Sequence, residues 1–344
     1  MRLTDIVAQE TAVRALLSSI RRSSVAHAYL FAGPRSVGKT TTALALASAL
    51  NCVEPSSEGD ACGRCLSCVR IEGGGDADVT VISPDGNQTR IEQMQEMIRS
   101  LNFAPLSRKF RVIIIEQADT LNPSSENCIL KILEEPPPYA VLILAVRNPN
   151  ILLPTIRSRC RLVRFRRART DEIGEALRSR FDLPEEELTV IAACADGAIG
   201  RAFRMASEPE FMEERRTVLE ALKDWADGPP IISLCLAEQI RSMAKPAKNS
   251  PEDETLVSNL TDMLEYVLSW YADLLDLKVR GGDASVANID CMKDLDAQVR
   301  RYTPGGLSAA VRTIMDTRRY LEGNITPQLA LENMFLALRP RGER

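Results

Sequence analysis

The sequence predicts a doubly wound α/β domain built on a parallel sheet, followed by a region made only of helices. Three observations support this prediction. Short apolar runs alternate with helical segments up to about residue 165, a glycine-rich phosphate-binding run follows the first of them, and apolar residues recur at helical spacing beyond that point. A length of 344 residues suits two or three domains. We expect an α/β domain over 1–165, a small helical domain over 166–207 and a larger one over 208–344.

Three apolar runs are predicted to be strands of the sheet. Residues 28–32 enter the glycine-rich turn, and the helix formers of 41–47 follow it. Residues 112–115 are all β-branched, as is typical of a strand buried on both faces. Residues 140–146 lie between a run of three prolines and an Asn-Pro pair. In such a sheet the ligand binds at the carboxyl ends of the strands.

The rest of the chain is predicted to be helical. Apolar residues recur at helical spacing in the stretches 170–183, 184–207, 256–277 and 304–322. The Gly-Pro-Pro run at 228–230 is expected to separate two helices, and 245–251 to form an exposed loop.

The composition is that of a globular protein without a membrane segment. Hydrophobic residues make up 45% of the chain and charged residues 26%. The chain has no run of about 18 apolar residues and no apolar signal-peptide core at its N-terminus, so we expect a cytoplasmic protein. A formal net charge of −4 disfavours a protein that binds nucleic acid alone, because phosphate affinity depends on clustered Lys and Arg. Any DNA contact is expected to be shared with partners.

The run G-P-R-S-V-G-K-T has the spacing of a phosphate-binding loop, or P-loop. Gly33 and Gly38 allow the backbone to fold round the phosphates, and Lys39 is expected to reach the β- and γ-phosphates. Thr40 offers its hydroxyl to Mg²⁺, and Thr41 completes the set of nucleotide-binding residues at the start of the helix. A strand before the loop and a helix after it are the context that this motif requires.

Four cysteines that closely follow the loop predict a structural zinc site. Cys52, Cys62, Cys65 and Cys68 have the spacing of four thiolate ligands to one tetrahedral Zn²⁺, with no open position for chemistry. Nine cysteines in a reducing compartment favour thiols or a metal over disulfides. The other cysteines are expected to be small core residues: Cys128, Cys160, Cys194, Cys235 and Cys291.

The acidic residues expected of an ATPase are incomplete. Glu116 closes the second predicted strand, where a P-loop ATPase needs a carboxylate for Mg²⁺. The next position usually carries a second acid that polarises the attacking water, but here it is Gln117, and an amide cannot act as a general base. We therefore expect impaired hydrolysis even where nucleotide binding survives. Asp119 is the alternative acid, two positions further on.

Two other polar features are expected to be structural. Arginines concentrate between 157 and 169, and most of them are expected to form a solvated face. The single histidine, His27, is expected to pack beside the nucleotide or in the core rather than act as a base.

The chain resembles the clamp-loader subunits of bacterial DNA polymerase III, AAA+ proteins that open the sliding clamp and place it on primed DNA. The resemblance rests on the run 27–31, the P-loop, the four-cysteine insertion, the L-K-I-L-E-E-P run at 130–136 and Ser158-Arg159-Cys160. It covers about the first 205 residues, whereas the C-terminal third matches only in length and helical character. It implies an AAA+ domain with a zinc module at about 50–70, then a helical lid and an all-helical collar that holds the complex together.

Within that family the chain looks more like the delta-prime subunits than like the gamma and tau motors. The motors open with an Arg-Lys-Trp-Arg-Pro stretch and carry Asp-Glu at the second strand, and this chain has neither. Arg147 stands near the end of the third strand, where a Thr is expected. The segment 197–202 also looks like the delta-prime form of the sensor-2 segment, which contributes an arginine to the nucleotide site.

The resemblance implies a stator that completes a partner's ATPase site. Arg159 would be an arginine finger acting in trans on the neighbouring motor, and Arg201 would reach nucleotide bound in this chain. Its own ATPase would be weak or absent, with ATP and Mg²⁺ as candidate ligands. The implied partners are gamma/tau and delta subunits in a hetero-pentamer, with the sliding clamp and primed DNA reached through that complex, as part of a DNA-directed DNA polymerase.

Two alternatives remain open at this point. An ATP-hydrolysing gamma/tau-type motor is favoured by the intact Lys39 and Thr40 and disfavoured by Gln117 and Arg147. A stand-alone zinc-containing nucleotide-binding protein, such as a kinase or signalling regulator, would be indifferent to the motor subunits.

Overall fold

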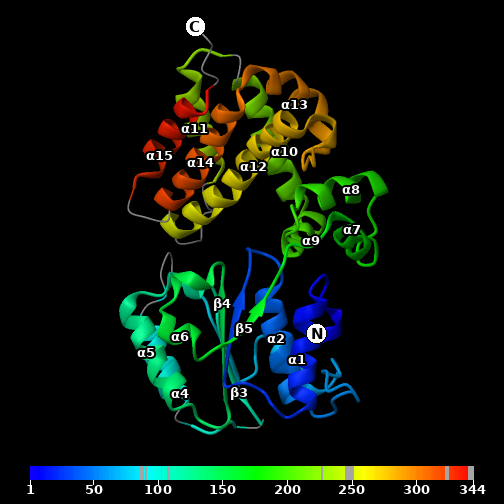
Figure 1. Ribbon diagram of the computed structural model, residues 1–344, viewed down its shortest axis with the longest axis vertical. Helices are drawn as coiled ribbons and strands as arrows, with labels where there is room; N and C mark the ends of the chain where they lie inside the picture. The colour runs from blue at the N-terminus through cyan, green and yellow to red at the C-terminus, as the bar shows by residue number, and fades with distance from the viewer. Residues whose placement is uncertain are drawn as a thin grey trace. The chain divides into compact units, whose positions relative to one another are not determined.

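The computed structural model describes residues 1–84, 89, 91–101, 103–106, 109–225, 228–244, 252–321 and 325–339. Internal contacts divide the chain into two compact units, 1–176 with 197–201 and 177–196 with 202–344 (Figure 1). A separate lid over 166–207 stays a prediction. The loop expected at 245–251 lies outside the described residues.

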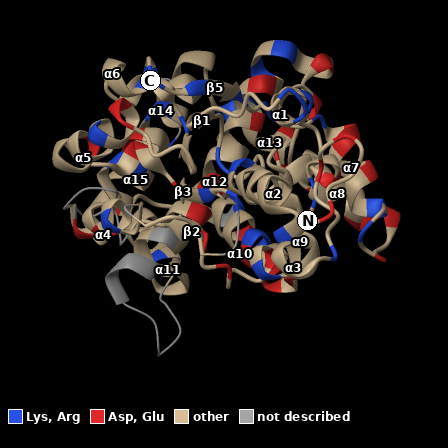
Figure 2. Cartoon of the chain, turned by 90° about the horizontal axis from the view of Figure 1, so that it is seen from below, with Lys and Arg blue, Asp and Glu red and all other residues tan. Residues whose placement is uncertain are grey.

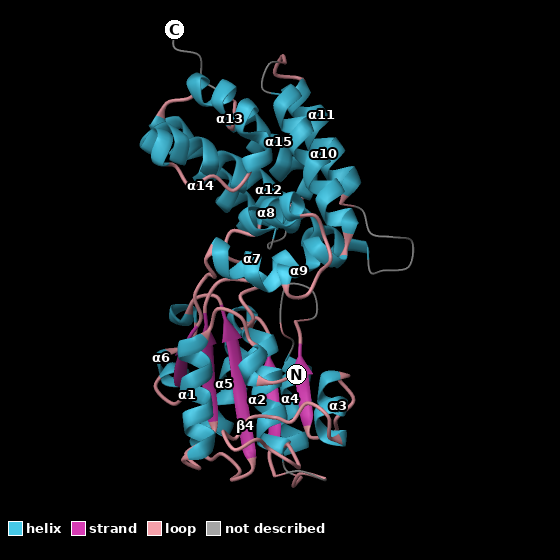
Figure 3. Cartoon of the chain, turned by 90° about the vertical axis from the view of Figure 1, so that its right-hand side faces the viewer, coloured by secondary structure: helices cyan, strands magenta, loops and turns pink. Residues whose placement is uncertain are grey.

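The first unit is built on a five-stranded parallel sheet (Figure 3). Its strands are β1 (Ala28–Ala32), β2 (Val79–Ile82), β3 (Arg111–Ile115), β4 (Ala140–Val146) and β5 (Arg161–Arg164). The order across the sheet is β2-β3-β4-β1-β5, so the first strand of the chain lies inside the sheet between β4 and β5. The predicted α/β class with a parallel sheet is confirmed.

The three central strands were predicted from their apolar runs, whereas the two edge strands were not. Every residue of β1, β3 and β4 is buried, as a strand covered on both faces requires. In β5 only Val163 is buried, and in β2 only Ile82. These edge strands therefore lack the continuous apolar run by which a buried strand is recognised.

Helices cover both faces of the sheet (Figure 1). On one face lie α1 (Glu10–Arg21), α2 (Lys39–Asn51) and α3 (Leu66–Glu72), and on the other α4 (Ile91–Leu101), α5 (Pro123–Glu134) and α6 (Pro154–Arg157). Successive strand residues alternate between the two cores: Tyr29 and Phe31 pack with the first set of helices, and Leu30 packs with the second. The sheet is therefore packed against an apolar core on each face.

The second unit is helical, as the periodicity predicts. Its helices are α8 (Glu185–Cys194), α10 (Pro209–Trp225), α11 (Ile232–Met243), α12 (Glu252–Arg280), α13 (Met292–Gln298), α14 (Pro304–Leu321) and α15 (Pro327–Ala337). The long α12 packs against α10 and α14, while α11 packs against α15. Trp225, Trp270, Tyr271 and Phe335 are fully buried in this unit. Two further helices, α7 (Thr170–Arg178) and α9 (Ile199–Ser207), contribute residues to both units.

In the part of the chain that the structure describes, no helix has both the length and the apolar character needed to cross a bilayer.

Candidate nucleotide site and metal centre

The P-loop joins the carboxyl end of β1 to the N-terminus of α2. Gly33 donates its N–H to Val146 O at 3.1 Å, which ties the loop to the end of β4. A Cβ on Gly33 would lie 2.5 Å from Phe165 O, so only glycine fits there. Gly38 has a φ of +95° and caps α2, a backbone conformation that favours glycine. The loop is therefore preformed for an anion at a helix N-terminus.

Lys39 lies folded against its own loop. Its Nζ donates to Gly33 O at 2.7 Å and also to Pro34 O. The pKa of Lys39 is lowered to about 8, mainly by burial, with the cations of Arg147 and Arg35 adding to the effect and Asp119 opposing it. Lys39 therefore loses its charge above about pH 8, whereas an ordinary lysine stays charged up to about pH 10.

The threonines after Lys39 differ in their surroundings. Thr40 is half-buried and Thr41 is exposed. The buried Thr42 donates its hydroxyl to Gly38 O at 2.7 Å and braces the start of the helix. All five predicted residues thus lie in one segment that runs from the end of β1 into the first turn of α2: Gly33, Gly38, Lys39, Thr40 and Thr41.

Glu116 follows β3 directly and is half-buried. Its carboxylate accepts a hydrogen bond from Ser83 Oγ at 2.8 Å. Gln117 is exposed and has a φ of +46°, at the sharp turn into the short helix Ala118–Thr120. The chain therefore carries one carboxylate and one amide at this strand end.

Asp119 is engaged in an ion pair. Nε of Arg147 donates to its carboxylate at 2.8 Å, and the Arg147 N–H contacts the same group at 3.4 Å. Because Ala32 and Val146 are paired in the sheet, Arg147 follows β4 beside the first glycine of the P-loop. The cation and the carboxylate thus meet at the edge where the phosphate-binding loop begins.

Arg201 belongs to the same compact unit as the P-loop. The residue before it, Gly200, donates its N–H to Ser36 O in the loop at 2.8 Å. Arg201 is half-buried in α9. Tertiary contacts therefore bring the backbone of Arg201 to the P-loop across a long stretch of sequence.

Gln9, which the sequence analysis did not single out, forms hydrogen bonds that support the P-loop. Its Nε2 donates to Val37 O at 3.3 Å and to Arg166 O at 2.8 Å, and its Oε1 accepts from Arg166 N at 3.1 Å. Only 3% of Gln9 is exposed. A buried amide must satisfy its donors and acceptor, and here it does so by joining the loop to the segment after β5. No motif in the sequence marks this residue, which directly precedes α1.

Arg159 projects from a tight turn between α6 and β5 and is exposed. The neighbouring Cys160 packs against the core formed with α4, α5 and α6, and burial raises the pKa of its thiol to about 12. Ser158 Oγ and Arg159 Nη1 both donate to Thr155 O, at 3.0 and 3.1 Å. In the Ser-Arg-Cys run, Cys160 therefore packs inward and the preceding Arg159 lies at the surface.

The other arginines of this region form the expected solvated face. Arg161, Arg164, Arg166, Arg167 and Arg169 are exposed. Acidic partners neutralise several of them: Arg166 pairs with Glu172 at 2.7 Å and Arg169 with Asp171 at 3.1 Å. Figure 2 shows basic and acidic residues interspersed along the chain. The predicted solvated face is confirmed for these residues.

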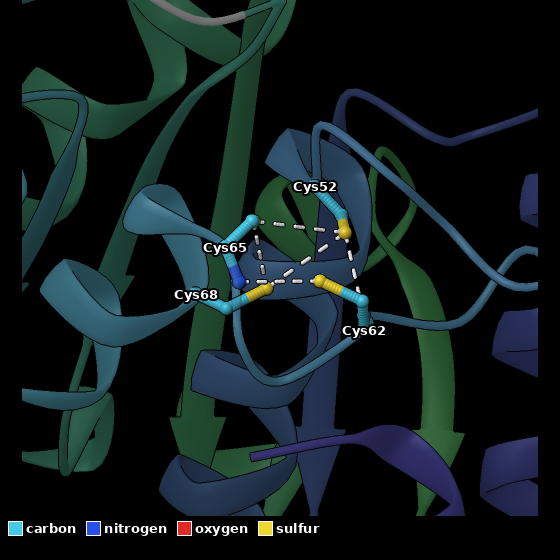
Figure 4. A group of neighbouring side chains, drawn as sticks. All are labelled: Cys52, Cys62, Cys65 and Cys68. Atoms are coloured by element: carbon cyan, nitrogen blue, oxygen red, sulfur yellow. Dashed lines mark hydrogen bonds between the residues drawn. The ribbon is translucent and has the colours of Figure 1, made fainter.

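The four predicted metal ligands converge at one point (Figure 4). The Sγ atoms of Cys65 and Cys68 are 3.5 Å apart, those of Cys68 and Cys52 3.8 Å, and those of Cys52 and Cys65 4.0 Å. A tetrahedral Zn²⁺ with Zn–S bonds of about 2.3 Å requires sulfur separations of about 3.8 Å. The cluster, completed by Cys62, therefore fits zinc in donor type and geometry.

Burial and hydrogen bonding give the thiols of the cluster different pKa values. Burial raises the pKa of Cys68 to about 12, and hydrogen bonds with Cys65 and Cys52 add to this. Burial acts upward on Cys65 too, but hydrogen bonds from the backbone of Val53 and Cys68 outweigh it and lower its pKa to about 6. Four thiolates would repel one another strongly here, and a divalent cation would remove that repulsion.

Asp60 attaches the metal module to the N-terminal segment. Its carboxylate accepts from Leu3 N at 2.9 Å, from Thr4 N at 3.0 Å and from Thr4 Oγ1 at 2.9 Å. The residue is only 3% exposed, and it also accepts from Ala61 N at 2.8 Å. The module thus fixes the segment that leads into α1.

Two minor expectations are wrong. His27 is exposed rather than buried in the core, and because it precedes β1 it lies at the strand end opposite the P-loop, away from the nucleotide site. Cys235 is exposed and is no core residue, whereas Cys194 and Cys291 are buried. His27 and Cys235 belong to no periodic pattern in the sequence, so their burial could not be predicted from it.

The fold and site define an AAA+-type P-loop protein with a four-cysteine cluster that could hold a metal ion. The family model for the DNA polymerase III delta subunit matches residues 8–169. The family model for the C-terminal part of that subunit matches residues 209–339. The chain belongs to the family of DNA polymerase III clamp-loader subunits.

Individual relatives agree with this assignment. The chain is 25% identical to the DNA polymerase III subunit delta′ of Bacillus subtilis over 96% of both chains. It is 32% identical to the subunit tau of the same organism, in an alignment that covers 60% of this chain. That alignment spans only 37% of the length of the tau subunit. A gamma subunit-related protein from Thermotoga maritima has the same fold, with a TM-score of 0.50, 18% identity and coverage of 95% of this chain and 98% of its own.

Proposed function

We propose that this chain is the delta′ subunit of a clamp loader: a stator that completes the ATPase site of a neighbouring gamma/tau motor and hydrolyses little ATP itself. Its partners would be gamma/tau and delta subunits in a hetero-pentamer that acts in the cytoplasm on the sliding clamp and primed DNA. The match to delta′ along 96% of both chains supports this choice over a motor, since the chain matches the tau relative over only part of its length.

The observation that carries the proposal is the placement of Arg159. It is exposed on a turn whose next residue, Cys160, is anchored in the core. A guanidinium held in this way can reach a phosphate on an adjacent subunit without moving its own backbone. A cation beside a transferring phosphoryl group stabilises the charge that develops there, and such fingers contribute on the order of 10³-fold or more to turnover.

The nucleotide site of the chain supports the proposal that the chain itself hydrolyses little ATP. The P-loop is complete, so ATP with Mg²⁺ is its expected ligand. The residue after Glu116 is the amide Gln117, and the nearby carboxylate of Asp119 is paired with Arg147. Neither is thus free to take a proton from water, and hydrolysis in this chain would be slow even with nucleotide bound. Zn²⁺ on the four cysteines would serve structure only, since all four positions are taken by protein ligands.

The proposal is tested by ATP turnover of the reconstituted loader with primed DNA and clamp. Arg159→Ala should reduce turnover at the affected site by about a thousandfold or more, while Lys39→Ala should have little effect. The reverse pattern, with turnover by the isolated chain, would instead establish the motor function that the intact P-loop favours. A stator and a motor would each co-elute with gamma/tau in size-exclusion chromatography, whereas a stand-alone nucleotide-binding protein would not.

A further inference from the structure

The guanidinium of Arg159 is bound by two groups of its own chain. Its Nη2 donates to Oε1 of Glu134 at 3.2 Å, and its Nη1 donates to Thr155 O at 3.1 Å. Glu134 is the last residue of α5, and Thr155 lies in α6. The side chain of Arg159 is 37% exposed and that of Glu134 is 55% exposed. Arg159 is therefore oriented by a surface ion pair and a backbone carbonyl.

We propose that Glu134 is a positioning residue that holds Arg159 in a resting orientation until the phosphates of a neighbouring subunit displace it. This inference rests on the proposed function, in which Arg159 acts on a neighbour's nucleotide. A carboxylate that stays on the guanidinium would lie close to the phosphates and repel them. Arg159 must therefore exchange Glu134 for the phosphate, while Cys160 keeps the backbone of the turn in place.

The exchange has a limited energetic effect because both partners are exposed. Surface ion pairs are worth up to about 1 kcal/mol, which corresponds to a population shift of up to about fivefold. Removing the charge of Glu134 should therefore raise basal turnover of the partner's site about two- to fivefold. Turnover stimulated by primed DNA and clamp should stay the same, since the phosphates then already hold Arg159. The ratio of stimulated to basal turnover should fall.

The experiment measures both turnover rates, and the KM for ATP, in the reconstituted loader with Glu134→Gln. Glu134→Asp keeps the carboxylate, so its basal rate should be lower than that of Glu134→Gln. Glu135→Gln is the matched control: Glu135 is the next residue along the chain and is exposed, and within the described residues it makes no hydrogen bond to Arg159. Equal basal rates for Glu134→Gln and wild type, or an equal rise with Glu135→Gln, would overturn the proposal.

A double variant separates this inference from the proposed function. Glu134→Gln combined with Arg159→Ala should turn over ATP at the rate of Arg159→Ala alone, since Glu134 acts only through that arginine. A twofold or larger increase in the double variant over Arg159→Ala would overturn the inference. If Arg159→Ala itself leaves turnover intact, the proposed function fails. If it abolishes turnover while Glu134→Gln behaves as wild type, only the inference fails.

Discussion

Arg147 and Asp119 form an ion pair at the base of the phosphate-binding loop, with 2.8 Å between Arg147 Nε and the Asp119 carboxylate. Only 3% of the Asp119 side chain is exposed, against 32% of the Arg147 side chain. The pair therefore joins a buried anion to a cation that reaches the surface. It couples the end of β4 to the turn after β3, two elements that frame the nucleotide site.

Arg147→Ala should destabilise the first unit. The substitution leaves the Asp119 carboxylate buried without its cation, and we expect a loss of about 1–3 kcal/mol in the free energy of unfolding, less than for a fully buried pair. Urea denaturation measures it. Arg164→Ala, at an exposed position of β5, is the control and should change stability by less than about 0.5 kcal/mol. Equal midpoints for the two variants would contradict the prediction.

Nucleotide binding should weaken as the pH rises through about 8. The pKa of Lys39 is lowered to about 8 by burial, so the cation that attracts phosphate is present below that pH and lost above it. The affinity for ATP should fall by up to about tenfold for each pH unit well above 8. Titration calorimetry between pH 7 and 9.5 tests this. Lys39→Arg should give a flat profile, since arginine stays charged, and a flat profile for wild type would show that Lys39 does not control binding.

The purified chain should contain about one Zn²⁺. A chelator should remove it and lower the melting temperature, because four converging thiolates repel one another without a cation. Cys65→Ala should abolish stoichiometric zinc, whereas Cys235→Ala, at an exposed cysteine outside the cluster, should retain it. Elemental analysis measures the zinc content, and thermal unfolding measures the melting temperature. A folded, metal-free wild-type protein would rule out a structural zinc.

Arg215 should be essential to the helical unit. Its buried side chain donates to Asp290 at 2.7 and 2.8 Å and to Asn288 at 2.8 Å, and Asn288 in turn bonds Asp273 at 2.7 Å. Arg215→Met leaves the buried Asn288 without this donor, whereas the Asp290 side chain is 35% exposed and can be rehydrated. We therefore expect a loss of about 1–3 kcal/mol in the free energy of unfolding.

The matched control for that loss is the next residue. Arg216 is 64% exposed and pairs only with Glu213 within its own helix among the contacts described. Arg216→Met should cost at most about 0.5 kcal/mol. Similar urea midpoints for the two methionine variants would show that the buried network adds little to stability.

The sequence alone predicted the features that depend on short-range patterns. The continuous apolar runs of β1, β3 and β4, the P-loop from Gly33 to Thr40 and the spacing of Cys52 to Cys68 are each contained in a short stretch of sequence. Backbone conformation and ligand spacing are fixed locally in such runs, so composition and period suffice to recognise them. The edge strands β2 and β5 escaped recognition because only part of each is buried.

Only the tertiary structure decided which side chains meet. Asp119 pairs with Arg147, Glu134 with Arg159, and Asp60 with the N-terminal segment, and no local pattern marks any of these pairs. Each depends on the order of strands in the sheet or on where a loop returns. A carboxylate or guanidinium looks the same in sequence whether it faces water or a partner. Its charge acquires a role only when folding removes water and brings the opposite charge within reach.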